Sequence, residues 1–186
     1  VVNDVRDLEG RDGEMLLYDS RRDEIVMFGG ACCGNGPGYA YHVSDTWRFV
    51  NGTSTDGVWK DVDVELAPLP REFGNLVYDV NDDRAVLCFG LDGSQPNYMN
   101  DCHELSFSSG QRPAWKKLYS AGHLPDARWA AAVVYDKRND RLVVFGGQGR
   151  KTNTTLNDVH FLSLGESTRW QDPVVSGSSP SERRFP

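Results

Sequence analysis

The chain has 186 residues, of which 20 are Lys or Arg and 27 are Asp or Glu, so its formal net charge is −7 at pH 7. Because the basic residues are scattered and outnumbered, neither nucleic acid nor an anionic membrane surface is an expected partner. The longest apolar run extends only from Trp129 to Tyr135, far short of the roughly 20 residues that cross a bilayer, so no membrane insertion is expected.

Short runs in which apolar and polar residues alternate predict β-strands, and the 19 Gly and 9 Pro residues between them disfavour long helices. Turns rich in Asn and Asp, at residues 21–23, 81–83 and 138–140, join the first two strands of each group of four. In chain order the predicted strands are Glu14–Tyr18, Glu24–Phe28, Thr46–Val50, Val58–Val62, Asn75–Tyr78, Ala85–Phe89, Cys102–Phe107, Ala114–Leu118, Ala131–Tyr135, Leu142–Phe145, Val159–Leu164 and Arg169–Gln171.

Several landmarks recur three times in one order, which indicates an internal repeat. An Arg lies seven residues before each Tyr-Asp pair, and a Pro-x-x-Arg sequence recurs once more near the C-terminus. The recurring landmarks are Arg11, Arg71, Arg128 and Arg183; Tyr18-Asp19, Tyr78-Asp79 and Tyr135-Asp136; Phe28-Gly29-Gly30, Phe89-Gly90-Leu91 and Phe145-Gly146-Gly147; Asp45, Asp101 and Asp158; and Trp59, Trp115 and Trp170. We expect the three Trp residues to share one structural duty, packing within the blades.

A period in the fifties with four strands, a Gly pair after the second strand and a Trp opening the fourth resembles the kelch repeat. The resemblance covers residues 11–186 and departs from the pattern at Leu91, where a second Gly is usual, and at the third-strand aromatic position, where His103 and His160 replace Trp47. It implies an all-β, kelch-type β-propeller, here partial, with antiparallel four-stranded blades around a central channel.

The repeat divides one propeller domain into expected blades at residues 11–70, 71–127 and 128–182. Residues 1–10 are expected to be the tail of a preceding blade or its connecting strand, and residues 183–186 the start of a further blade. Because propellers close with about four to eight blades, we expect the natural protein to be longer than these three.

The four cysteines, Cys32, Cys33, Cys88 and Cys102, match neither a zinc site nor a dense disulfide framework. The sequence leaves open whether Cys88 and Cys102, or the adjacent Cys32 and Cys33, form disulfides. We favour a cytoplasmic protein, whereas possible N-glycosylation at Asn51 and Asn153 leaves an extracellular one open.

No residue pattern predicts a catalytic residue, a metal site or a cofactor. The histidines His42, His103, His123 and His160 lack the spacing of metal ligands, and we interpret His103 and His160 as structural substitutes for Trp47. The alternative that the resemblance leaves open is a propeller domain of a larger enzyme, galactose-oxidase-like or specifier-protein-like, or of a secreted glycoprotein.

The function predicted from the repeat is a non-catalytic scaffold or adaptor that binds a protein or peptide through the loops at one mouth of the propeller. Candidate contact residues in these loops are Tyr39, Tyr41, Tyr98 and Met99. The resemblance also implies a partial ring of Arg11, Arg71, Arg128 and Arg183 at one mouth. These arginines either pair with Asp45, Asp101 and Asp158, or stay open to acidic side chains of a partner.

Overall fold

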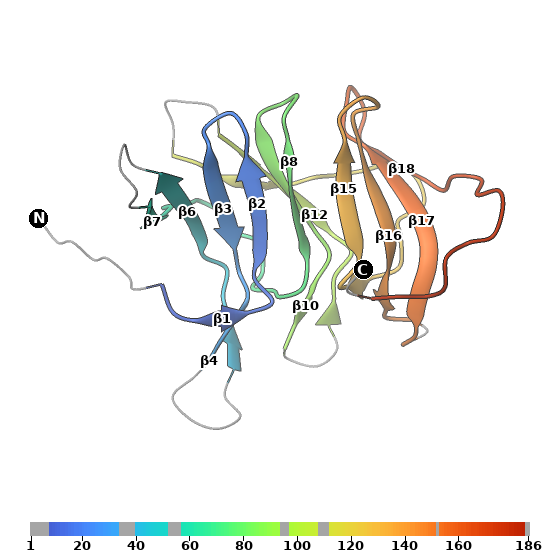
Figure 1. The fold of residues 1–186 in the computed structure, drawn as a ribbon, viewed down its shortest axis with the longest axis horizontal. Coiled ribbons are helices and arrows are strands. Elements are labelled where there is room, and N and C mark those ends of the chain that lie inside the picture. Colours follow the sequence, from blue (N-terminus) through green and yellow to red (C-terminus); the bar gives the residue numbers. More distant parts are fainter. Residues whose placement is uncertain are drawn as a thin grey trace, which may run out of the picture.

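A computed structural model of the chain describes residues 8–33, 40–51, 57–93, 97–107, 112–151 and 153–184. All regular elements in these ranges are β-strands. The strands form three main antiparallel sheets that stand side by side in chain order, from left to right in Figure 1. We call these sheets blades 1, 2 and 3, and they confirm the predicted kelch-type β-propeller fold. The described residues contain no helix of the length and hydropathy that a membrane span requires.

Each blade pairs its four main strands in sequence order. Blade 1 contains β2 (Met15–Asp19), β3 (Glu24–Phe28), β6 (Thr46–Asn51) and β7 (Gly57–Asp61). Blade 2 contains β8 (Asn75–Asp79), β9 (Arg84–Cys88), β12 (Cys102–Ser106) and β13 (Trp115–Lys117). Blade 3 contains β15 (Ala132–Asp136), β16 (Arg141–Gly149), β17 (Thr155–Ser163) and β18 (Arg169–Gln171).

Shorter strands before the first strand of a blade, or between its second and third strands, were not predicted. They are β1 (Arg11–Asp12) with β4 (Ala31–Cys33) and β5 (Ala40–His42), and the hairpin of β10 (Leu91–Asp92) and β11 (Asn97–Tyr98). In blade 3 no separate hairpin is present at this place, because β16 and β17 themselves extend past a register shift between Phe145 and Gly147. The short strand β14 (Arg128–Trp129) pairs with the extended part of β16. Figure 1 shows β1, β4 and β10 at one end of the blades, which we call the mouth.

The hairpins at the opposite end are built identically in all three blades. The tyrosine hydroxyl of each Tyr-Asp pair donates a 2.7 Å hydrogen bond to an aspartate five residues later. That aspartate has a positive φ, a conformation that Asp adopts more readily than most residues. The three bonds join Tyr18 to Asp23, Tyr78 to Asp83, and Tyr135 to Asp140.

The predicted alignment of the glycine landmark in blade 2 is wrong by one residue. The backbone N–H of Gly29 donates to Asp45, and the residue that makes the same bond in blade 2 is Phe89, which donates to Asp101. Phe89 has a φ of 64°, close to the 67° of Gly29 and the 64° of Gly146. Cys88-Phe89-Gly90 is therefore the counterpart of Phe28-Gly29-Gly30, because hydrogen bonding and backbone conformation, not the letters Phe-Gly, define the position.

The hydrophobic cores lie between neighbouring blades. One cluster joins Met15, Leu17 and Phe28 of blade 1 to residues of blade 2 that include Trp115. A second cluster joins Val86, Cys88, Phe89 and Cys102 of blade 2 to residues of blade 3 that include Leu142 and Trp170. Each blade therefore stabilises its neighbours, as in other repeat architectures.

Two of the three repeated tryptophans confirm the expected packing duty. Trp115 is 1% exposed with its ring centroid 5.2 Å from that of Phe28, and Trp170 is 2% exposed and 5.9 Å from Phe89. Trp59 is only half-buried and packs against Phe49 of its own blade. Trp59 therefore packs within its own blade and is less buried than the other two, because their rings pack on the preceding blade and the described residues include no blade before blade 1.

Replacing Trp115 with Ala is expected to lower the free energy of unfolding by about 3–5 kcal/mol, because it leaves a cavity between blades 1 and 2. Trp59→Ala is the matched control and should cost less than half as much, since Trp59 is already half exposed. Urea denaturation measures both values. Equal losses for the two variants would contradict the assignment of the cores to the blade interfaces.

Candidate functional site

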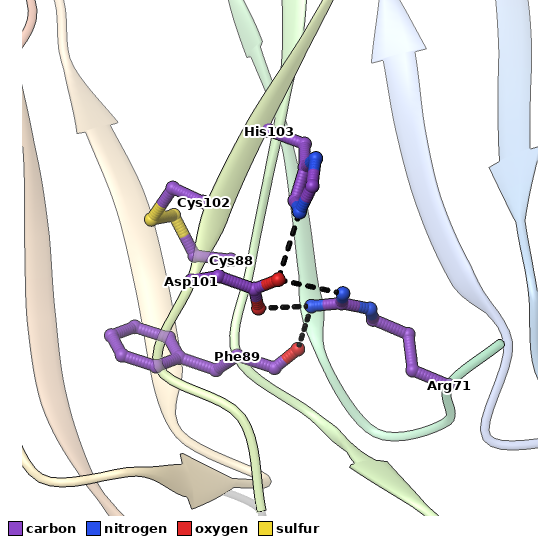
Figure 2. Close-up of a disulfide and its surroundings, with 6 residues drawn as sticks. All are labelled: Arg71, Cys88, Phe89, Asp101, Cys102 and His103. Carbon is purple, nitrogen blue, oxygen red and sulfur yellow. Dashed lines mark hydrogen bonds and ion pairs between the residues drawn. A yellow bond between two sulfur atoms is a disulfide. The ribbon is translucent and has the colours of Figure 1, made fainter. Parts of the chain in front are cut away.

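The repeated arginines form bidentate ion pairs with the repeated aspartates, as the first of the two alternatives predicted. In blade 2 both Nη atoms of Arg71 bond to the carboxylate of Asp101, and Nη1 also donates to the carbonyl oxygen of Phe89 (Figure 2). The shortest Nη–Oδ distances are 2.6 Å for Arg11 and Asp45, 2.8 Å for Arg71 and Asp101, and 2.7 Å for Arg128 and Asp158.

A third side chain completes each pair. The indole Nε1 of Trp47 donates to Asp45 over 2.7 Å, while Nε2 of His103 and of His160 lies 2.8 Å from Asp101 and Asp158. The interpretation of His103 and His160 as substitutes for Trp47 is confirmed, because each ring nitrogen contacts the repeated aspartate of its own blade.

Burial explains why these pairs need complete hydrogen bonding. The side chains of Arg71 and Arg128 are 0% exposed, and that of Arg11 is 6% exposed. Burial by itself raises the pKa of Asp101, but the hydrogen bond from His103 and the pair with Arg71 outweigh it and hold that pKa well below its usual range. The pKa of Asp158 is lowered in the same way by His160 and Arg128.

The backbone of each arginine contacts the preceding blade. The carbonyl oxygen of Arg71 accepts a 2.8 Å bond from Gly30, and that of Arg128 accepts a 3.0 Å bond from Gly90. Arg183 repeats this contact with Gly147 at 3.0 Å. Its exposed guanidinium differs from the other three, because within the described residues it hydrogen-bonds to Ser181 and not to a repeated aspartate.

The predicted contact residues of the mouth lie in different environments. Tyr41 on β5 is 48% exposed, and its hydrogen bond to Glu9 raises the pKa of its phenol to about 12. Tyr98 on β11 is half-buried, with its ring centroid 6.4 Å from that of Trp129. Met99 is only 7% exposed, and its backbone carbonyl accepts a hydrogen bond from the Arg128 N–H at the start of the next blade. Tyr39 lies outside the described residues.

A groove of about 800 Å³ adjoins Tyr41, between β5 and the chain that leaves blade 1. Sequence reasoning did not find this groove, because residues far apart in the chain form it. Trp47 contributes an aromatic surface, and acidic side chains outnumber the single arginine of its lining. Charged and aromatic residues of the lining include Glu9, Arg11, Tyr41, Trp47, Asp61 and Asp63.

The remaining histidines make isolated contacts. His42 lies 3.2 Å from Glu72, and the exposed His123 lies 3.5 Å from Asp172. Across the ranges that the structure describes, no three His, Cys, Asp or Glu side chains gather in a way that would hold a metal ion.

The cysteine question that the sequence left open is answered for one pair. Cys88 and Cys102 are direct cross-strand partners on β9 and β12, and they form a disulfide (Figure 2). Cys32 on β4 is buried, and nothing is described of the Cys33 side chain. Asn153 is exposed and Asn51 ends β6, and glycosylation of either residue stays a prediction.

The three blades with their interlocked Arg–Asp pairs define a β-propeller of the kelch type. The KLHDC2/KLHL20/DRC7 Kelch-repeats domain matches residues 80–186, and the chain belongs to this kelch-repeat family. Domains of this family are generally non-catalytic, and membership indicates a protein-interaction module.

Several longer proteins resemble the chain. Dynein regulatory complex subunit 7 of Chlamydomonas reinhardtii is 36% identical over 102 residues, which cover 53% of this chain and 8% of the relative. The flagellar outer arm dynein alpha chain of the same organism is 27% identical over 87% of this chain and 3% of its own length. The Rho GTPase-activating protein gacHH of Dictyostelium discoideum is 26% identical over 86% of this chain and 10% of its own length.

The fold also resembles a solved structure described as "Structure of YjhT". The TM-score is 0.62 at 16% identity, and the match covers 90% of this chain and 47% of the other. The chain thus spans about half of that structure and a tenth or less of the curated relatives.

Arg128→Glu is expected to lower the free energy of unfolding by about 3–5 kcal/mol, because it places a second carboxylate beside Asp158 in a buried site. Arg183→Glu is the matched control and should change stability by less than about 0.5 kcal/mol, since its guanidinium is exposed. Urea denaturation gives both values. A stable Arg128→Glu variant would refute a structural role for the buried pair.

Stability is expected to fall as the pH drops below about 5, because Asp101 and Asp158 have lower pKa values in the folded chain than the roughly 3.9 of an unfolded Asp. At such pH values the unfolded chain binds more protons than the folded chain. The contribution of the two aspartates to the free energy of unfolding is therefore complete above the pKa of an unfolded Asp, and it is lost as the pH falls towards their pKa in the folded chain. Urea midpoints from pH 7 to pH 3 measure the slope. Asp158→Asn should flatten it, and an unchanged slope would contradict this origin.

Proposed function

We propose that the chain is a non-catalytic protein-interaction scaffold that binds a partner protein through the mouth hairpins. The observation that supports this most directly is the exposed Tyr41 beside a groove of about 800 Å³. A tyrosine offers a large rigid contact area and a polar hydroxyl, which is why this residue is frequent in protein interfaces. The similarity to a subunit named for a dynein regulatory complex also supports a protein partner.

The contact surface that we propose comprises Tyr41, Tyr98 and Arg183. Arg11, Arg71 and Arg128 are engaged by their aspartates, which leaves Arg183 as the arginine whose exposed guanidinium is suited to an acidic group of a partner. Met99 contributes by supporting the hairpin, since its side chain is buried. Tyr39 stays a candidate from the sequence.

We also propose that the chain functions within a longer propeller. The backbone carbonyl of Arg183 accepts a hydrogen bond from the Gly147 N–H, just as the carbonyl of Arg128 accepts one from Gly90. Since Arg128 lies at the start of a blade, the same contact at Arg183 supports the start of a further blade there. The apolar face of blade 1 supports the same view. Leu16 is 51% exposed there, whereas its counterpart Leu76 in blade 2 is 6% exposed under blade 1.

The test compares partners recovered by the Tyr41→Ala/Tyr98→Ala double variant, the wild type and a control variant. Tyr119→Ala is the control, because Tyr119 is 81% exposed and lies outside the mouth hairpins. Affinity purification with quantitative mass spectrometry should show proteins that the wild type and the control retain and the double variant loses at least tenfold. Purified binding assays then check each of them.

Identical partner sets for the double variant and the wild type would refute the mouth as the contact surface. Circular dichroism and the urea midpoint must be unchanged in the double variant, so that a loss reports contact and not unfolding. Arg183→Glu, added to the same comparison, tests the acidic partner. Loss of partners with Arg183→Glu supports it, and full retention refutes it.

A further inference from the structure

Blade 2 differs from its neighbours at three positions that contact one another. The cross-strand pair at the end of the second strand is Phe28 and Thr46 in blade 1, and Phe145 and Val159 in blade 3. In blade 2 that pair is the disulfide between Cys88 and Cys102. The next residue along the strand is Gly29 in blade 1 and Gly146 in blade 3, but it is Phe89 in blade 2.

These differences act together at the interface with blade 3. The ring that packs on the tryptophan of the next blade belongs to Phe28 in blade 1, and in blade 2 it belongs to Phe89, one residue later. Cys88, Phe89, Cys102 and Trp170 belong to one buried cluster. In the view of Figure 2, the disulfide and the Phe89 ring lie to the left of the Asp101 carboxylate, and Arg71 lies to its right.

The disulfide also closes the segment that forms the mouth hairpin of blade 2. The two cysteines are 14 residues apart, and the segment between them contains β10, β11 and Asp101. Asp101 directly precedes Cys102 and holds the buried Arg71. The cross-link therefore limits the freedom of the hairpin and of the ion pair that fixes blade 2.

We propose that the Cys88–Cys102 disulfide is a redox-sensitive cross-link that sets the stability of the joint between blades 2 and 3 and of the β10–β11 hairpin. A dithiol reductant supplies two electrons. Its thiolate attacks the sulfur of one cysteine, which breaks the protein S–S bond and releases the other cysteine as a thiolate. The second thiolate of the reductant then attacks the reductant sulfur of the resulting mixed disulfide and releases the remaining protein thiolate, and protonation leaves two protein thiols and a cyclic oxidised reductant. The ratio of the disulfide form to the dithiol form depends on the surrounding thiol pool, because reducing compartments keep such cysteine pairs as thiols.

Phe89 makes the joint dependent on this bond. A residue with a side chain at positive φ is strained, and here the surrounding packing must hold it. Reduction frees the two ends of the segment while leaving Phe89 in the strained conformation, so the segment opens more often. This proposal does not depend on the mouth binding a partner.

The experiment compares the oxidised wild type with the same protein reduced by dithiothreitol under native conditions. Intact mass and thiol counting show whether the bond is reduced, and hydrogen exchange follows peptides that cover β10, β11 and β12. We expect exchange there to rise about tenfold or more on reduction, since closing a loop of this length restricts the open state. Peptides of β2 and β3 in blade 1 provide the internal reference.

The matched variant is Cys88→Phe/Phe89→Gly/Cys102→Val, which gives blade 2 the residues that blade 3 has at these positions. Its hydrogen exchange should be the same with and without reductant. A wild type that resists reduction in the native state, or that exchanges equally in both redox states, overturns the proposal without any variant. A triple variant with the wild-type sensitivity to reductant also overturns it, because the effect would then arise elsewhere.

Discussion

The buried Arg–Asp pair is the interaction on which the arrangement of the blades depends. Through its side chain Arg71 holds Asp101 at the start of the third strand and the carbonyl of Phe89 at the end of the second. Through its backbone the same residue accepts a hydrogen bond from Gly30 of the preceding blade. Because desolvating both charges offsets much of their attraction, the pair fixes geometry more than it adds net stability. Removing one partner of the pair lowers the free energy of unfolding, because the other charge is then buried without a counter-charge.

This linkage explains why the hydrophobic cores lie between the blades. A single four-stranded sheet cannot cover its own apolar faces. Each blade therefore buries them against the neighbouring blade. Val26 and Leu87, on facing sides of blades 1 and 2, are both fully buried, whereas Val134 on the outer side of blade 3 is 60% exposed. Neighbouring blades therefore share their buried clusters, so the loss of one blade exposes apolar residues of the next.

The sequence predicted the elements that depend on local or strictly periodic signals. The hairpin turns after the Tyr-Asp pairs and the four strands of each blade follow from the repeated pattern, and the pairing of Arg128 with Asp158 was one of the two alternatives that the repeat offered. The alignment of Phe89 with Phe28 was wrong because it followed the letters Phe-Gly. The constant spacing of ten residues after the tyrosine of each Tyr-Asp pair places Cys88 opposite Phe28 and Phe145, and the hydrogen bond from Phe89 to Asp101 agrees with that register. The groove beside Tyr41 depends on segments that only the tertiary fold brings together.

The three blades share the base of their mouth hairpins but differ in the hairpins themselves. The arginine, its aspartate and the backbone contacts to glycine recur in every blade and form the base of each mouth hairpin. The hairpins themselves differ: β4 pairs with β5, β10 pairs with β11 over only two residues, and β16 and β17 simply continue. A rigid base tolerates such differences because the ends of each hairpin are fixed by buried charges, whatever lies between them. Recognition of a partner is therefore best sought in the hairpins, where the repeat constrains the side chains least.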